Sequence, residues 1–210
     1  MLTVYGVYRS RATRPIWLLG EIGMEWRHVP VIQTRRLASA GAGEAPLHTT
    51  SPDFAALNPM CEIPCIEDDG MVLTESLAIT WYIARRYGGT FGPQTQKEEA
   101  QMAQWMLLAG TTIEPPALTI LGASDDAARD KGTAQLAKPF AWLDRHLADH
   151  RWLVADRFTV ADVMLAECVR YAQGHPPALA PYPHLADWLA RCQARPAWQA
   201  MWARRNAEPA

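Results

Sequence analysis

The types and spacing of hydrophobic residues near the start of the chain predict a strand, a helix and a second strand. Residues 2–8, LTVYGVY, are rich in β-branched and aromatic types and predict a strand. Residues 11–23, RATRPIWLLGEIG, then carry apolar side chains at helical spacing up to a glycine. Pro15 is tolerated only in a first helical turn, so the helix is expected to begin near residue 13 or 14. Residues 25–32, EWRHVPVI, predict the second strand, and the three segments predict a right-handed βαβ unit with parallel strands.

The residues after this unit predict a long loop, a β-hairpin and a second helix. Residues 33–54 are rich in Ala, Gly, Ser, Thr and Pro and show no period, which indicates a loop. EIPCIED at 62–68 and MVLTE at 71–75 have the pattern of short strands joined by an Asp-Gly turn, which is typical of a hairpin. The following SLAITWYIARRYG carries apolar residues at helical spacing between Ser76, a favourable N-cap, and Gly88.

The second half of the chain shows only helical patterns. After the turn-rich segment GGTFGPQTQ, the longer segments all carry apolar residues at helical spacing. Pro115 and Pro116 interrupt one of these segments and are expected to end or kink its helix. The patterns therefore predict a small α/β domain at 1–88, a linker at 89–97 and an all-helical domain at 98–210.

Composition and charge narrow the class of protein. The chain has 210 residues, of which 49% are hydrophobic and 20% are charged, as is typical of a globular protein. Its net charge of -2 provides no basic field for a nucleic-acid backbone. No apolar run approaches the roughly 20 residues of a membrane span, and the N-terminus lacks the basic region and cleavage site of a signal peptide. We therefore expect a soluble cytoplasmic protein that binds neither nucleic acid nor membranes.

The spacing of cysteine and histidine predicts no metal site. The cysteines are Cys61, Cys65, Cys168 and Cys192. Their spacing matches neither a redox pair nor a zinc framework, so ordinary reduced thiols are expected. Cys61 is the candidate for a reactive thiol, because it precedes the turn at Pro64 and can be exposed there. His146 and His150 lie four residues apart on an expected helix without a third ligand, so we expect a solvated pair.

Pro64 interrupts the first strand of the hairpin and indicates a peptide-binding edge. Proline has no N–H to donate to a sheet ladder, so it is normally found at an edge or a bulge. If the bond between Ile63 and Pro64 is cis, the N–H and C=O of Ile63 face outward, and an extended peptide can pair with them. Ser76 begins a helix whose N-terminal amides favour a carboxylate, and Glu75 beside it can accept from an ammonium group. One end of the expected ligand thus carries both charges, as an amino acid does.

Several motifs with matching offsets resemble those of the cytosolic glutathione transferases. NPMCEIPCIEDDGMVLTESLAITWYIARRYG is similar to the family's signature, and PHLADWLARCQARPAW is similar to its C-terminal tail. FTVADVMLA, with Thr159 and Asp162 as a capping box, resembles the family's helix-6 capping motif. The resemblance spans essentially the whole chain. It implies a thioredoxin-like α/β N-terminal domain, an all-α C-terminal domain, a homodimer active in detoxification, and glutathione as co-substrate.

The resemblance also assigns roles to the expected peptide site. It implies that Ile63 pairs with the cysteinyl backbone of glutathione and that Glu75 and Ser76 hold its γ-glutamyl end. The glycyl carboxylate is expected to meet His48 or the arginines at 35 and 36, and the residues leave this choice open. The full set expected to contact glutathione is Ile63, Pro64, Glu75, Ser76, Arg14 and His48.

The loop before the first helix is expected to activate the thiol of glutathione. Lowering the pKa of a thiol by about 2 units requires roughly 2.7 kcal/mol of selective thiolate stabilisation, which a hydrogen-bond donor and a helix N-terminus can supply. The spacing Ser10-x-x-x-Arg14 resembles that of the family's serine-type members, whereas its bacterial cysteine-type members carry Cys near the position of Ser10. A bacterial serine-type protein is therefore expected. Ser10 is the expected catalytic donor, and Tyr8 and Thr13 stay open as alternative donors.

The resemblance implies that the thiolate attacks a small hydrophobic electrophile, which makes the protein a glutathione S-transferase enzyme. Trp105, Met106 and Tyr171 are expected to belong mainly to the core and also to line the pocket for this electrophile. Two alternatives stay open. The first is a non-catalytic ligand-binding or regulatory protein, and the second is a glutathione-dependent disulfide reductase or peroxidase that would use Cys61 or Cys65.

Overall fold

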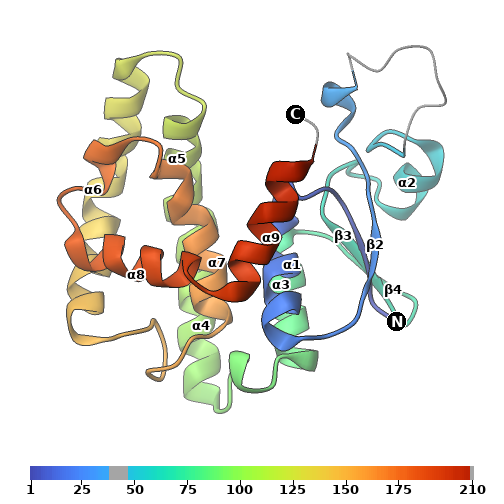
Figure 1. Cartoon of the computed structure of the whole chain (residues 1–210), viewed down its shortest axis with the longest axis horizontal. Coiled ribbons are helices and arrows are strands. Elements are labelled where there is room, and N and C mark those ends of the chain that lie inside the picture. The colour runs from blue at the N-terminus through green and yellow to red at the C-terminus, as the bar shows by residue number, and fades with distance from the viewer. Residues whose placement is uncertain (38–46, 209–210) are drawn as a thin grey trace. The chain divides into compact units, whose positions relative to one another are not determined.

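The structure of the chain is a computed structural model that describes residues 1–37 and 47–208 (Figure 1). It divides into two compact units, one of Met1–Tyr87 with Gln199–Ala210 and one of Gly88–Trp198. Residues 38–46, which belong to the long loop expected at 33–54, lie outside the described residues. Within the described part of the chain, no helix combines the length and the apolar character needed to cross a bilayer.

A mixed four-stranded sheet is the frame of the first unit. Its strands are β1 (Thr3–Tyr5), β2 (Arg27–Val29), β3 (Cys65–Asp68) and β4 (Met71–Leu73), in the order β2-β1-β3-β4. β1 runs parallel to β2 and antiparallel to β3, and β3 forms an antiparallel hairpin with β4. The parallel strand pair and the hairpin are therefore confirmed. β3 begins only after Pro64, because proline cannot donate to the ladder.

Helices lie on both faces of this sheet. They are α1 (Thr13–Ile22), α2 (Pro52–Leu57) and α3 (Ser76–Tyr87), with a 3-10 turn at Thr34–Arg36. α1 and α3 pack against each other on one side, and α2 lies on the other side (Figure 1). Side chains alternate along a strand, so Cys65 points to the face opposite that of its neighbour in β3. There it joins Val31 and Phe54 in a buried cluster, called here the α2 cluster.

The end of the chain groups with the first unit, although sequence patterns placed all of 98–210 in the helical domain. α9 (Pro196–Ala207) belongs to the first unit from Gln199 onward. The reason is a set of long-range polar contacts, in which Arg204 reaches Tyr8 and Glu208 reaches the loop after β1. The extents of independently folding domains stay a prediction.

The second unit is helical. Its main helices are α4 (Gln96–Leu108), α5 (Glu114–Leu121), α6 (Asp126–Asp149), α7 (Val160–Val169) and α8 (Pro183–Gln193). Short helical turns lie at Gly89–Phe91, Ala109–Ile113, Arg170–Ala172 and Pro176–Ala178. α7 is the central helix, because all ten of its residues are buried and it packs against α4, α5 and α8. A small α/β unit with a helical second unit confirms the expected fold class.

The proline pair separates two helices, as expected. α4 passes into a π-helical turn at Ala109–Ile113, and α5 begins at Glu114 with prolines in its first turn. Pro115 and Pro116 are tolerated there because the first amides of a helix have no intrahelical acceptor.

Asp162, in the first turn of α7, accepts hydrogen bonds from several neighbouring groups. The expected capping box is confirmed. The carboxylate of Asp162 accepts from the amide of Thr159 at 2.9 Å and from the hydroxyl of Thr159 at 3.2 Å. It also accepts from the amide of Leu153 at 3.1 Å and from the indole N–H of Trp188 at 2.9 Å. Because Asp162 is fully buried, this one side chain fixes the start of α7 to α8 and to the preceding loop.

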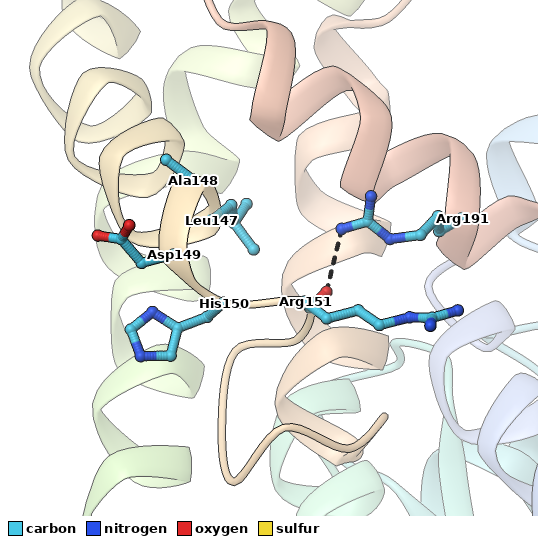
Figure 2. Close-up of a pocket in the computed structure, with 6 residues that line it drawn as sticks. All are labelled: Leu147, Ala148, Asp149, His150, Arg151 and Arg191. Carbon is cyan, nitrogen blue, oxygen red and sulfur yellow. Dashed lines mark hydrogen bonds between the residues drawn. The ribbon is translucent and has the colours of Figure 1, made fainter.

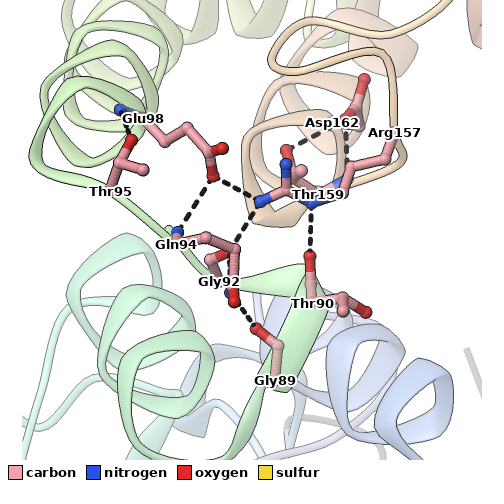
Figure 3. A network of polar contacts seen from close by, with 9 residues as sticks. All are labelled: Gly89, Thr90, Gly92, Gln94, Thr95, Glu98, Arg157, Thr159 and Asp162. Carbon is pink, nitrogen blue, oxygen red and sulfur yellow. Dashed lines mark hydrogen bonds and ion pairs between the residues drawn. The ribbon is translucent and has the colours of Figure 1, made fainter.

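Arg157 ties the expected linker to the loop before α7 (Figure 3). Its guanidinium donates to the carbonyls of Thr90 at 2.9 Å and Gly92 at 3.2 Å, and it pairs with Glu98. Glu98 also accepts from the amide of Gln94 at 3.0 Å. The hydrogen bond from Arg157, followed by that from Gln94, lowers the pKa of Glu98, which keeps its carboxylate charged. The segment is therefore anchored within the second unit.

Replacing Gly132 by alanine is expected to destabilise the protein, because α5 and α6 approach closely there. An added Cβ would lie 2.7 Å from Cγ1 of Ile120 and 2.8 Å from the backbone oxygen of Pro116. Alanine in a helix is ordinarily better than glycine by about 1 kcal/mol, whereas overpacking costs about 1–3 kcal/mol. The difference is a loss of up to about 2 kcal/mol, which we expect as a lower free energy of unfolding of Gly132→Ala in urea titrations. The control Gly174→Ala meets open space, and an equal midpoint for both variants would contradict the clash.

Candidate active site

Gly6 brings the loop after β1 close to Ile63. Its φ of 149° is a backbone conformation that side chains disfavour. A Cβ on Gly6 would lie 3.2 Å from the Cβ of Ala12 and 3.5 Å from that of Ile63. The amide of Gly6 donates to the carbonyl of Val29 at 3.0 Å, which fixes the start of the loop to the sheet. The missing side chain therefore lets the loop at 7–12 lie against Ile63.

The hydroxyl of Ser10 is half-buried and is held within this loop. Its oxygen donates to the carbonyl of Val7 at 2.6 Å and accepts from the amide of Ala12 at 3.0 Å. α1 begins directly afterwards at Thr13. Rotation about the Cβ–Oγ bond redirects the proton to another acceptor, and a charged acceptor forms a hydrogen bond roughly twice as strong as a neutral one. Ser10 can therefore stabilise an anion placed beside the loop.

The two alternative donors are more deeply buried than Ser10. Tyr8 is 5% exposed, its hydroxyl accepts from Arg204 at 3.2 Å, and its ring lies edge-on to His28 at 5.2 Å. Thr13 is fully buried, and its hydroxyl donates to the carbonyl of Ser10 at 3.2 Å. Both hydroxyls contribute to the packing of the loop and of α1, which favours Ser10 as the donor.

The main chain of Ile63 is available to a partner. Among the described residues, none forms a hydrogen bond with its amide or its carbonyl. The bond between Ile63 and Pro64 is cis, and the side chain of Ile63 packs on the α2 cluster. The preceding turn is held by buried Asn58, whose side-chain amide donates to the carbonyl of Glu62 at 2.7 Å. A fixed side chain with an unpaired main chain suits the addition of a peptide strand.

Arg14 lies behind Ser76 rather than at the surface. Its guanidinium is 1% exposed and donates to the hydroxyl oxygen of Ser76 at 2.8 Å. Ser76 is the first residue of α3 and not its N-cap, because the carbonyl of Glu75 accepts the first helical hydrogen bond, from Ile79. Glu75 is exposed with a φ of 66°. The hydroxyl proton of Ser76 has no acceptor in the described part of the chain, so it can be donated to an anion near the positive end of α3.

His48 lies at the edge of the first unit. Its Nδ1 is 3.1 Å from the hydroxyl oxygen of Thr50 and 3.4 Å from that of Thr34. Arg35 is exposed, and Arg36 donates to the side chain of Gln33 at 3.3 Å. These residues flank 38–46, so the group that meets a glycyl carboxylate stays a prediction.

The thiols near the site differ in exposure. Burial, followed by the nearby charge of Glu67, raises the pKa of Cys65 to about 11. Cys65 therefore stays a neutral thiol at physiological pH and is a poor nucleophile. Cys61 is half-buried, has a φ of 53°, and its sulfur lies 3.7 Å from the carbonyl oxygen of Pro59.

The residues expected to line the electrophile pocket belong to the second unit. Trp105 of α4 is 4% exposed, and its ring stacks on Trp142 with centroids 5.0 Å apart. Met106 is half-buried beside it. Tyr171 follows α7 and is 8% exposed, with the guanidinium of Arg170 4.6 Å from its ring centroid. Trp105 and Tyr171 are buried core residues, whereas Met106 is only half-buried. The role of all three in a pocket stays a prediction.

The histidine pair is bound to backbone groups. The rings of His146 and His150 stack with centroids 4.3 Å apart, and each has a ring nitrogen next to a carbonyl oxygen, at 3.1 Å from Leu153 and 2.9 Å from His146 respectively. His150 is exposed, whereas burial, followed by the nearby His150, lowers the pKa of His146. The expected solvated pair is therefore only half right. The described residues contain no group of three or more metal-ligating side chains.

Among the hollows in the described part of the chain, two lie in the second unit, and none of the expected site residues lines either. Figure 2 shows the first, of about 370 Å³, where Arg191 of α8 donates to the carbonyl of Arg151 at 3.0 Å. Leu147, Ala148, Asp149 and His150 also line it. The second, of about 480 Å³, lies between α5 and α6 beside Thr112 and Lys131. Neither hollow combines a nucleophile with an anion site.

Three residues that contact the candidate site were not expected from the sequence: Asn58, Arg204 and Glu208. Asn58 precedes a proline, and this dipeptide is typical of a turn, so the sequence could have indicated Asn58 as a turn residue. Glu208 reaches Tyr8 across 200 positions of the chain, and no local pattern signals such a contact.

Comparisons with known proteins cover nearly the whole chain. Family models match for the glutathione S-transferase N-terminal domain at residues 8–86 and for the C-terminal domain at residues 90–196. Glutathione S-transferase 3 of Zea mays is 33% identical over 214 residues, which is 94% of this chain and 91% of the relative. Glutathione transferase F7 from Populus trichocarpa has a similar structure, with a TM-score of 0.82 and 26% identity over 98% of this chain and 100% of that one. The theta class glutathione S-transferase of Xanthomonas axonopodis pv. citri, solved with glutathione bound, gives a TM-score of 0.77 and 27% identity over 95% of each chain.

Proposed function

This chain belongs to the glutathione S-transferase family and is a glutathione S-transferase enzyme, and we propose that the hydroxyl of Ser10 activates its thiol co-substrate. The observation that carries the proposal is the approach of the Ser10 loop to Ile63 at the side-chain-free Gly6. A tripeptide paired with the main chain of Ile63 would bring its central residue, the cysteine of glutathione, next to this loop.

In the proposed binding site, main-chain groups pair with the cysteinyl backbone of glutathione, and polar and charged side chains bind its two ends. The amide and carbonyl of Ile63 would pair with the cysteinyl backbone. Glu75 would accept from the γ-glutamyl ammonium, and Ser76 would donate to the carboxylate. Arg14 would act through Ser76, because it is buried and holds the serine oxygen. His48 is the proposed partner of the glycyl carboxylate.

The proposed thiolate stabilisation has the right size. A hydrogen bond from Ser10 to a thiolate is worth about 1.5–3 kcal/mol, but it replaces a neutral bond to Val7 worth about 1 kcal/mol. The N-terminus of α1 adds about 0.3–1 kcal/mol. The sum is about 2 kcal/mol, or roughly 1.5 pKa units, which is most of the shift that an activated thiol requires.

The electrophile, the assembly and the location are also proposals. We propose a small hydrophobic electrophile that contacts Trp105, Met106 and Tyr171. A cytoplasmic homodimer is proposed as well, and the edge strand β4 supports it because it exposes Met71 and Val72.

Replacing Ser76 by alanine is expected to weaken the binding of glutathione by about 1–3 kcal/mol, because a charge-assisted hydrogen bond is lost. Isothermal titration calorimetry measures the change in Kd. Ser76→Thr keeps the hydroxyl and should retain most of the affinity, and Ser124→Ala, at an exposed serine of the second unit, is the matched control. An unaltered Kd in Ser76→Ala would remove this residue from the proposed anchor.

The function as a whole is tested by retention on immobilised glutathione together with turnover of a chromogenic aryl halide. We expect both from the wild type. If the protein is retained on glutathione but converts none of several electrophiles, a catalytic role for Ser10 is contradicted.

A further inference from the structure

The side-chain carboxylate of Glu208 binds the loop that carries Ser10. The two carboxylate oxygens of Glu208 accept from the amide of Tyr8 at 2.8 Å and from the amide of Arg9 at 2.9 Å. The Nε of Arg9 donates in turn to the backbone carbonyl of Glu208 at 3.0 Å. Three hydrogen bonds therefore join Glu208 to the two residues immediately before Ser10.

The last turn of α9 places Glu208 against this loop. The amide of Glu208 donates to the carbonyl of Arg204 at 3.2 Å, and the guanidinium of Arg204 donates to the hydroxyl of Tyr8 at 3.2 Å. Tyr8 also packs edge-on against His28. The charged and titratable groups in these contacts are thus two arginines, Arg9 and Arg204, with the rings of Tyr8 and His28. All of them lie in the first unit.

The chemistry of the contact explains why the residue is a carboxylate. The two neighbouring amides donate to different oxygens of one side chain, and an ionised Asp or Glu is the side chain with two acceptor oxygens and no donor. Its bonds to backbone amides are charge-assisted and stronger than neutral ones. The two bonds of the Ser10 hydroxyl, to Val7 and Ala12, lie inside the loop and cannot fix the position of the loop as a whole.

We propose that Glu208 is a positioning residue that holds the loop so that the Ser10 hydroxyl meets the sulfur of glutathione. This inference rests on the proposed role of Ser10. A group that acts on a reacting atom must be held within about 0.5 Å of its productive position, and a loop needs external contacts to reach that precision. The negative charge of Glu208 acts in the opposite sense, because it disfavours a nearby thiolate. Arg9 and Arg204 offset that charge, so positioning outweighs it.

The test compares Glu208→Ala with the wild type across pH. The variant should raise the pKa of the bound thiol and lower kcat/KM for the aryl halide about tenfold near pH 6.5. The loss should shrink toward about pH 9, where a thiol ionises without help. The Kd for glutathione should not change, because its anchors lie on other segments. Glu208→Gln keeps one acceptor and should lose less, and the control Asn206→Ala, at an exposed position of α9, should match the wild type.

A double-mutant cycle identifies the residue through which Glu208 acts. The variant with both Ser10→Ala and Glu208→Ala should be no slower than Ser10→Ala alone, because both changes act on one hydroxyl. Losses that multiply would overturn the inference. A Glu208→Gln variant whose bound thiol has a lower pKa than in the wild type would also overturn it, since the carboxylate would then act only by its charge.

Amide hydrogen exchange separates this inference from the proposed function. The amides of Tyr8 and Arg9 should exchange more slowly in the wild type than in Glu208→Ala, whichever residue activates the thiol. Equal exchange rates would overturn the contact itself. If Ser10→Ala alone leaves turnover unchanged, the proposed donor is wrong, and the positioning role of Glu208 falls with it even where exchange reports the contact.

Discussion

Ser10→Ala is expected to lower kcat/KM for an aryl halide about 100-fold while the Kd for glutathione stays nearly the same. The reason is that the hydroxyl acts on the charged sulfur and not on the bound peptide, and removal of one donor to a developing anion typically costs about 10²–10³ in rate. Steady-state kinetics with glutathione in excess measure the loss. The pH profile adds a second readout, because the thiol should lose its lowered pKa and the deficit should be largest below about pH 8.5.

Tyr8→Phe is the control for the hydroxyl of Ser10. It removes an oxygen that already accepts from Arg204, and its effect on kcat should be far smaller than that of Ser10→Ala. A larger loss in Tyr8→Phe than in Ser10→Ala would transfer the donor role to the tyrosine. Unchanged turnover in Ser10→Ala would exclude the serine.

Asp162→Ala is expected to lower the free energy of unfolding by about 3–5 kcal/mol, because it leaves several buried hydrogen-bond donors without an acceptor. The indole N–H of Trp188 and the amides of Leu153 and Thr159 all donate to this carboxylate. Each buried donor left unpaired costs about 1–3 kcal/mol, and entering water offsets part of the sum. Urea denaturation followed by fluorescence measures the change.

The same carboxylate should make stability depend on pH. Burial raises the pKa of Asp162 from 3.8 to about 6, although its hydrogen bonds to Trp188, Thr159 and Leu153 act to lower it. The folded state thus binds a proton more tightly than the unfolded chain. The stability gained from that proton is present below about pH 4 and is lost as the pH rises through about 6. Asp162→Asn keeps one acceptor, does not titrate, and should lack this component.

Asp130→Ala is the control for Asp162→Ala, since Asp130 is an exposed carboxylate on α6. It should leave the unfolding midpoint within experimental error. A similar midpoint for Asp130→Ala and Asp162→Ala would mean that the buried network contributes little, which would contradict the role assigned to it.

Local patterns were sufficient for α1, α3 and the hairpin of the first unit, but not for α2, which begins inside the segment expected to be a loop. The spacing of apolar residues and the position of Pro15 predict α1 to within a residue, and the Asp-Gly turn predicts the hairpin. The strands are shorter than their apolar runs, because backbone geometry limits them. β1 ends before Gly6, whose positive φ turns the chain, and β3 cannot include Pro64 as a donor.

Long-range contacts set the limits of sequence reasoning at the candidate site. Arg14 sits in the first turn of α1, and an arginine at such a position is ordinarily solvated. It is buried instead because its partner, Ser76, lies 62 positions away on α3. The same holds for Glu208, whose acceptors meet amides at the opposite end of the chain. A side chain that acts by pairing with distant backbone has no periodicity to reveal it.

The side chain and the main chain of Ile63 are under different constraints. Its side chain faces the interior of the first unit, and the groups offered to a ligand are the same in every amino acid except proline. Packing within the first unit therefore limits which side chains are tolerated at this position. Redesign of ligand preference through this contact would have to alter the peptide backbone itself, for example by N-methylation, because every residue other than proline offers the ligand the same amide and carbonyl.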